Sequence, residues 1–291
     1  MRLRSVPPIL VLLLVSLGIA GAQPATAVQS RFFTTSDGVR LHYIEAGPPR
    51  GHTVVLVPGW TMPGWIWGPQ IRDLSARYHV VAFDPRGQGE SEVAVSGYEP
   101  GRRGQDIAEL IARMGSEPVL LVGWSLGVLD ALAYVHAQGD RRIAGLVLVD
   151  NSIGEEPAPL PSRARPHRGP KPPIAVRMSR FVRGMFRKPQ SEAYLETLTE
   201  ATLRTPEYAS NALLSYPVPR SYWRDAVYST DKPILYAVRP VWMGQAENLA
   251  RHHRAAEIAV FPDAGHALFV DDATRFDALL QDFIQRRIWP R

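Results

Sequence analysis

The chain of 291 residues contains no cysteine. This absence excludes disulfide bonds, a thiolate nucleophile, cysteine-ligated zinc, iron–sulfur clusters and lipid attachment through cysteine. Charged residues make up 21% of the chain and apolar residues 45%, which is neither a disordered nor a fibrous composition. The composition is that of a globular protein, and the length fits one large α/β domain with an insertion.

Long apolar segments are scarce as well. An apolar run from Ile9 to Ala20 follows two arginines and precedes several small residues. It is too short to span about 30 Å of membrane hydrocarbon as a helix, and this order of residues is typical of a secretory signal. We predict a signal peptide over residues 1–22, cleaved after Ala22; cleavage after Ala27 and an uncleaved anchor are the alternatives. The mature protein is then periplasmic or secreted.

Short, almost wholly apolar segments alternate with helical ones through much of the chain. Such unbroken runs are typical of parallel strands buried on both faces of a sheet. The expected strands are Arg31–Thr35, Val39–Glu45, Thr53–Val57, His79–Phe83, Val119–Val122, Ile143–Val149, Pro233–Val238 and Ala256–Phe261. The expected helices between or after them are Gln105–Met114, Leu126–Gln138, Ile174–Phe186, Ser191–Arg204, Pro206–Ser215 and Ala273–Arg287. The alternation predicts an α/β fold with a doubly wound, mostly parallel sheet.

This alternation stops after Asp150 and returns only at Pro233. We predict a core of residues 23–150 and 230–291, with residues 151–229 inserted as a helical cap. The insertion starts rich in proline and arginine and carries 12 Lys and Arg against 7 Asp and Glu. A solvated surface is the favoured interpretation of these charges. The alternative is an attraction to anionic partners, such as a weak contact with membrane surfaces, and any such preference is expected to act through the cap.

A candidate nucleophile lies between a predicted strand and a predicted helix. The segment Gly123-Trp124-Ser125-Leu126-Gly127 has the G-x-S-x-G pattern of a nucleophile elbow. The sharp turn leaves no room for larger side chains at the two glycines, and it raises the Ser125 hydroxyl above the carboxyl edge of the sheet. The alternative is a tight strand–helix turn without chemistry.

A serine nucleophile needs a base, and His266 is the candidate. It follows the last predicted strand, within Asp263-Ala264-Gly265-His266-Ala267, which places it at the same sheet edge as Ser125. An oxyanion formed during acyl transfer needs two backbone N–H groups close to the nucleophile. We expect these from Leu126, which follows the serine, and from Trp60, in the loop after the third predicted strand.

Four segments resemble those of a known family. They are Pro58-Gly59-Trp60, Asp84-Pro85-Arg86-Gly87-Gln88-Gly89-Glu90-Ser91, the elbow, and Gly265-His266. In these segments the chain resembles the α/β-hydrolase superfamily, and its Gly-Trp-Ser elbow is similar to that of small carboxylesterases. The resemblance implies a Ser–His–acid triad and a mainly structural role for the loop 84–91. The relatives with an aspartate nucleophile, haloalkane dehalogenases and epoxide hydrolases, are disfavoured because the elbow carries serine.

The acid of the triad departs from the family's usual pattern. That acid usually follows the strand expected at Pro233–Val238, but this chain reads Arg239-Pro240-Val241-Trp242-Met243-Gly244-Gln245 there. Asp150 ends the strand before the insertion, a position from which some relatives supply the acid, and we favour it. Glu247 is the alternative; a carboxylate there would also be typical of a helix N-terminus, which the macrodipole makes favourable for negative charge.

Together these residues predict an exported serine hydrolase that cleaves a small or medium carboxylic ester through Ser125, His266 and Asp150. Trp60 and Trp124 lie beside the expected oxyanion donors and are predicted to bind an apolar acyl group. No cofactor, metal or nucleic acid is expected as a partner. Two alternatives stay open: a lactone or C–C bond hydrolase with the same triad, and a non-catalytic α/β-hydrolase fold that binds a ligand.

Overall fold

The computed structural model describes residues 28–159 and 172–290. The predicted signal peptide and part of the basic stretch of the insertion lie outside these ranges. Within them, no helix has both the length and the apolar character needed to cross a membrane. The sheet and every candidate site residue named above are among the described residues.

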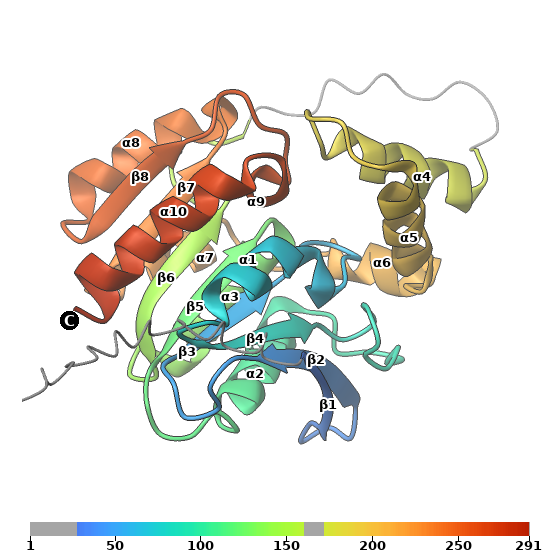
Figure 1. Cartoon of the computed structure of the whole chain (residues 1–291), viewed down its shortest axis with the longest axis horizontal. Coiled ribbons are helices and arrows are strands. Elements are labelled where there is room, and N and C mark those ends of the chain that lie inside the picture. Colours follow the sequence, from blue (N-terminus) through green and yellow to red (C-terminus); the bar gives the residue numbers. More distant parts are fainter. Residues whose placement is uncertain (1–27, 160–171, 291) are drawn as a thin grey trace, which may run out of the picture.

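An eight-stranded sheet runs through the middle of the molecule, with the order β1-β2-β4-β3-β5-β6-β7-β8 (Figure 1). Pairings from β4 to β8 along this order are parallel, whereas β2 is antiparallel to both of its neighbours. The strands are β1 (Gln29–Thr34), β2 (Arg40–Ala46), β3 (Thr53–Val57), β4 (His79–Asp84), β5 (Val119–Trp124), β6 (Ile143–Val149), β7 (Ile234–Val238) and β8 (Ala256–Val260). The predicted fold class is confirmed.

The strands form where the sequence has short apolar runs. β3, β4, β5 and β7 are buried at every residue, which is why their side chains do not alternate between apolar and polar. β3 and β6 have the predicted bounds, and no end of the other strands differs from the prediction by more than two residues. The agreement is close because a central parallel strand has the same apolar environment on both faces.

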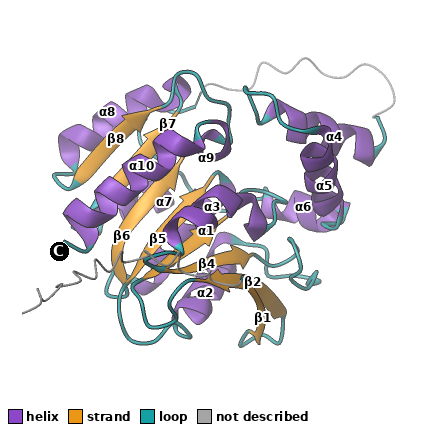
Figure 2. Cartoon of the chain, viewed as in Figure 1, coloured by secondary structure: helices purple, strands orange, loops and turns teal. Residues whose placement is uncertain are grey.

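Helices cover both faces of the sheet, as Figure 2 shows, so strands β2 to β8 contribute side chains to two cores. One core contains Val55 and Leu121 and is covered by α2 (Pro100–Ile111), α3 (Leu126–Gln138), α7 (Ser221–Tyr228) and α8 (Met243–His252). The other contains Val54 and Leu120 and is covered by α1 (Gly68–Leu74), α9 (Leu268–Asp271) and α10 (Ala273–Phe283). Short 3₁₀ or π segments are Gly64–Trp67, Pro240–Trp242 and Ile284–Ile288.

The insertion leaves the sheet after β6 and returns to it at β7. Three of its helices stand to one side of the sheet (Figure 1); they are α4 (Ile174–Gly184), α5 (Glu192–Leu203) and α6 (Glu207–Leu213). The fourth, α7, was not predicted, and it packs against core helix α3. In that contact the rings of His136 and Tyr222 lie 3.9 Å apart. The last part of the insertion therefore adds to the core, and we use "cap" below for α4–α6.

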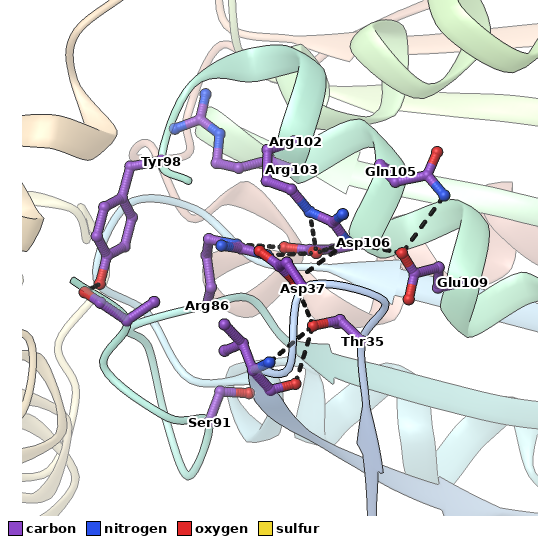
Figure 3. A network of polar contacts seen from close by, with 12 residues as sticks. Thr35, Asp37, Arg86, Ser91, Tyr98, Arg102, Arg103, Gln105, Asp106 and Glu109 are labelled. Atoms are coloured by element: carbon purple, nitrogen blue, oxygen red, sulfur yellow. Dashed lines mark hydrogen bonds and ion pairs between the residues drawn. The ribbon is translucent and has the colours of Figure 1, made fainter. Parts of the chain in front are cut away.

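The loop 84–91 after β4 is held by a buried arginine. Arg86 binds both carboxylate oxygens of Asp106, with Nε and Nη2 at 2.6 and 2.7 Å. Figure 3 shows that the same guanidinium also reaches Asp37, in the β1–β2 turn, at 3.1 Å. Arg102 approaches Asp106 from the preceding turn of α2 at 2.7 Å. One buried guanidinium thus ties together the loop, the hairpin turn and α2.

We expect Arg86→Ala to lower the free energy of unfolding by about 3 kcal/mol, because the buried Asp106 loses the partner that binds both of its oxygens. Urea denaturation measures this change. Arg31→Ala is the matched control, since Arg31 pairs with Glu45 on an exposed part of the β1–β2 hairpin. It should leave stability nearly unchanged. Equal effects of the two substitutions would contradict a structural role for Arg86.

Candidate active site

Ser125 lies on a sharp turn between β5 and α3. Its φ of 54° and ψ of −119° are unusual for a residue with a side chain, so the turn holds the serine in a strained conformation. A Cβ atom on Gly123 would lie 2.3 Å from Gly127 O, and one on Gly127 would lie 2.4 Å from Val57 O. Both positions therefore require glycine, as a nucleophile elbow does.

Ser125, His266 and Asp150 form one hydrogen-bonded chain. His266 follows β8, and its Nε2 lies 2.8 Å from Ser125 Oγ. Its Nδ1 lies 2.6 Å from Asp150 Oδ2. When Nδ1–H donates to the carboxylate, Nε2 is free to accept the serine proton. The structure thus brings together the three residues predicted from the sequence, with the geometry that activates a serine.

Asp150 is buried directly after β6, with a positive φ of 51°. Its backbone N–H donates to Ala237 O at 2.9 Å, which holds the strained residue against β7. Its carboxylate accepts two hydrogen bonds from Arg239: the backbone N–H binds Oδ1 at 2.9 Å and Nε–H binds Oδ2 at 2.6 Å. A buried carboxylate needs such donors to replace water.

The segment after Asp150 is hydrogen-bonded to the elbow. Asn151 Nδ2–H donates to Ser125 O at 2.7 Å, and Asn151 O accepts from the Tyr236 hydroxyl at 2.6 Å. Burial, with a smaller contribution from the Asp150 charge, raises the pKa of Tyr236 well above its ordinary value. The phenol therefore remains a neutral donor. Gln245 of α8 continues this support, because its Oε1 accepts from Ile153 N–H at 3.1 Å.

The alternative acid, Glu247, lies elsewhere. It is exposed, in the middle of α8 rather than at its start. Among the described residues, the carboxylate on the Nδ1 side of His266 is that of Asp150. The structure therefore places Asp150, and not Glu247, where a triad acid would be needed.

The two expected oxyanion donors lie on either side of the serine. Leu126 is the first residue of α3, and the first N–H groups of a helix have no partner within it. The loop that carries Trp60 passes against the elbow, since a Cβ on Gly59 would lie 3.0 Å from Ser125 Cβ. Neither Trp60 N–H nor Leu126 N–H donates to another group in the described parts of the chain. Both remain available to a ligand.

Gln88 braces the loop after β3. Its Oε1 accepts from Thr61 N–H at 2.7 Å, and its Nε2 donates to Gly59 O and Met62 O at 3.1 and 3.2 Å. Thr61 has a positive φ of 59°, so the loop needs such support to keep its conformation. The loop 84–91, expected to be structural, thus supports the backbone on which Trp60 lies.

The two tryptophans predicted to bind substrate have different surroundings. Trp124 is only 1% exposed; its ring lies 5.1 Å from the His266 ring, and its Nε1–H donates to His266 O at 2.8 Å. This burial does not favour a contact with substrate, and Trp124 instead supports the histidine. Trp60 is half-buried; its indole Nε1–H donates to Ser210 O in α6 at 2.7 Å, and its ring packs against Phe181 of α4. Trp60 therefore links the loop after β3 to the cap.

The loop that carries His266 is also fastened to the cap. Asp271 Oδ2 accepts from Gly265 N–H and from Arg187 N–H, both at 2.7 Å. On the other side of the histidine, Ala267 N–H donates to Met185 O at 3.1 Å. The segment between α4 and α5 therefore holds the backbone on both sides of His266.

Many basic side chains of the insertion are paired with acidic ones. The pairs are Arg177–Glu207, Arg183–Glu192, Lys188–Asp272, Arg204–Glu90 and Arg220–Glu156. This pairing reduces the positive field of the described part of the cap. Within the same part of the chain, no group of three or more His, Asp and Glu side chains is arranged to hold a metal ion.

Three residues that brace the site were not predicted: Gln88, Arg239 and Asp271. Arg239 could have been found from the sequence, because a charged residue directly after a central parallel strand lies at the sheet edge that carries the candidate site. Gln88 stands in a loop that was assigned a structural role without a specific contact. For Asp271 no local pattern exists, since its partners on the cap are distant in sequence.

Comparison with known proteins gives several relatives. A soluble epoxide hydrolase from Corynebacterium sp. (strain C12) is 33% identical over 117 residues, which are 40% of this chain and 40% of that protein. A non-heme haloperoxidase from Rhodococcus erythropolis is 33% identical over 119 residues, covering 40% and 43%. These matches span less than half the length of the relatives.

Solved structures match over most of the chain. A putative aryl esterase from Burkholderia cenocepacia has a TM-score of 0.74 at 23% identity, over 88% of this chain and 98% of that one. Esterase RhEst1 from Rhodococcus sp. ECU1013 has a TM-score of 0.74 at 24% identity, over 89% and 99%. Identities this low show a shared fold. The profile of the alpha/beta hydrolase family matches residues 54–279, and the chain therefore belongs to that family.

Proposed function

We propose that this protein is a serine hydrolase that cleaves a carboxylic ester of small or medium size. The observation that carries the proposal is the unbroken chain from Ser125 Oγ through His266 to the buried carboxylate of Asp150, with contacts of 2.8 and 2.6 Å. Near Ser125 lie the backbone N–H groups of Trp60 and Leu126, which donate to no other group among residues 28–159 and 172–290 and which could bind an oxyanion. Nucleophile, base, acid and oxyanion donors are thus close together at one sheet edge.

In the proposed first step, His266 Nε2 takes the proton of Ser125 while the serine oxygen attacks the ester carbonyl. The carbonyl oxygen becomes an oxyanion, which accepts hydrogen bonds from Trp60 N–H and Leu126 N–H. Asp150 stabilises the imidazolium and keeps Nδ1 protonated. The imidazolium then gives its proton to the alcohol, which leaves, and the acyl group stays on the serine.

In the second step, water takes the place of the alcohol. His266 removes a proton from the water, the resulting hydroxide attacks the acyl-enzyme, and the proton returns to Ser125 as the acid product leaves. The ring of Trp60, in the loop after β3, packs against the ring of Phe181 in the cap. These apolar rings favour an apolar acyl group in the substrate.

The serine at the elbow separates this proposal from one alternative. One relative is named an epoxide hydrolase, and such enzymes were disfavoured above because they use an aspartate where this chain has Ser125. Hydrolysis of a lactone or of a C–C bond would use the same three residues, and an ester panel that includes lactones tests those substrates directly. Export through the signal peptide 1–22 is part of the proposal, and so is a weak contact of the cap with anionic surfaces.

We expect a fluorophosphonate probe to label Ser125 in the folded protein, because the probe reacts with a serine whose proton is removed by a neighbouring base. Mass spectrometry of the labelled peptide identifies the site. Labelling should be lost in Ser125→Ala and after heat denaturation. It should be retained in the control Ser152→Ala, since Ser152 Oγ bonds to Gln245 and not to a histidine. A folded protein that stays unlabelled would support the non-catalytic ligand-binding fold.

We expect Asp150→Asn to lower kcat on an activated ester by about 10³-fold or more, because the amide cannot stabilise the imidazolium or hold the same tautomer. Glu247→Gln is the matched control and should change kcat by less than about twofold, since this side chain is exposed and distant from His266. Steady-state kinetics with a p-nitrophenyl ester measures both. Near wild-type kcat in Asp150→Asn would remove Asp150 from the proposed mechanism.

A further inference from the structure

A cation lies against the candidate acid. Arg239 is the first residue after β7, at the strand end where the family's usual pattern has the acid. Its Nε–H and His266 Nδ1 are both 2.6 Å from the same oxygen, Asp150 Oδ2. Its Nη2 lies 3.5 Å from His266 Nδ1. The guanidinium therefore contacts both partners of the Asp–His pair.

We propose that Arg239 is a positioning residue that fixes Asp150 and, through its charge, opposes protonation of His266. The proposal rests on the proposed function, since it assigns Arg239 a role in the same Ser125–His266–Asp150 chain. Replacing Arg239 is then expected to change both the protonation of His266 and the position of Asp150.

The positioning part follows from burial. The Asp150 side chain has 0% exposure, so water cannot solvate its charge. Arg239 replaces that water with two donors, one from the backbone and one from the side chain. The two donors bind different oxygens and so fix the plane of the carboxylate, which aims Oδ2 at His266. Asp150 also has a strained backbone, which a two-point contact helps to hold.

The charge part follows from the contacts of the imidazole ring. A carboxylate next to a histidine favours the imidazolium, and a guanidinium at the same oxygen opposes it. In the described parts of the chain, Asp150 and Arg239 are the charged side chains that contact the ring of His266. Ser125 and Trp124 approach it from the elbow without charge. The remaining charged side chains on neighbouring segments are directed to backbone groups, to each other or to solvent; they are Arg187, Lys188, Asp263, Asp271 and Asp272.

Two substitutions separate charge from geometry. Arg239→Gln removes the charge, whereas Arg239→Lys keeps a cation but loses the planar fork. The backbone hydrogen bond from residue 239 to Asp150 Oδ1 persists in both, so we expect both variants to fold. Arg251→Gln is the matched control, because Arg251 is an exposed arginine of α8 that contacts Asn248.

The first measurement is the titration of the His266 ring by ¹H–¹³C NMR, assigned by its absence in His266→Asn. We expect the midpoint in Arg239→Gln to rise by about one pH unit, as for the loss of a nearby unit charge near the protein surface. It should rise by less than half as much in Arg239→Lys and stay unchanged in Arg251→Gln. The second measurement is kcat/KM against pH, whose acid limb should move in parallel. A lower kcat in both Arg239 variants would support the proposed role of Arg239 in positioning the Asp150 carboxylate.

Identical titrations in Arg239→Gln and the wild type would overturn the proposal, and so would equal shifts in the glutamine and lysine variants. A merely structural arginine would lower stability and kcat without moving the titration. The NMR measurement does not depend on turnover. A wild-type protein without esterase activity whose His266 still titrates differently in Arg239→Gln would refute the proposed function and leave the role of Arg239 standing.

Discussion

The parallel register of β5, β6 and β7 decides where the groups of the site lie. Trp124 pairs with Val149, and Val149 pairs with Ala237, so the three strands end at nearly the same level. Ser125, Asp150 and Arg239 follow these ends directly. A shift of β6 by one residue would turn Asp150 to the other face of the sheet and break its contacts with His266 and Arg239. The buried apolar strands hold this register, and the strained φ angles at Ser125 and Asp150 are tolerated because the register holds them.

His266 depends on a different set of contacts. Its loop follows β8, rests on the Trp124 ring and is bonded to the segment between α4 and α5 on both sides of the histidine. The cap is also hydrogen-bonded to the loop after β3, through the Trp60 side chain. A displacement of the cap would therefore reach both His266 and the loop that carries Trp60. The cap is thus coupled to the candidate site through these hydrogen bonds.

The sequence was sufficient for features that depend on local patterns. The strands could be predicted because short, unbroken apolar runs in a globular chain are typical of buried parallel strands. Ser125 could be predicted because the sharp turn that carries it leaves no room for a side chain at the glycines two residues before and after it. From the sequence, Asp150 was a better candidate than Glu247 for the acid of the triad. The sequence could not decide between them, because the choice depends on which strand ends lie next to His266. Helix α7 and the contacts of Gln88, Arg239 and Asp271 could not be predicted, because each joins segments that are distant in the chain. Trp124 shows the converse: its position beside Ser125 was clear, but its burial depends on packing against the loop of His266 and on Phe269.

In the proposed triad the acid follows β6 instead of β7, and this position brings it into contact with Arg239. Arg239 and His266 both contact the Asp150 carboxylate, so the negative charge of this acid faces a guanidinium as well as the imidazole. In the proposed mechanism the imidazolium then gains less from the acid than it would from an unpaired carboxylate, whereas the developing oxyanion meets a more positive environment. Stabilisation of the transition state therefore depends more on the N–H groups of Trp60 and Leu126. This dependence agrees with the support those groups receive, since Gln88 makes three hydrogen bonds to the loop that carries Trp60.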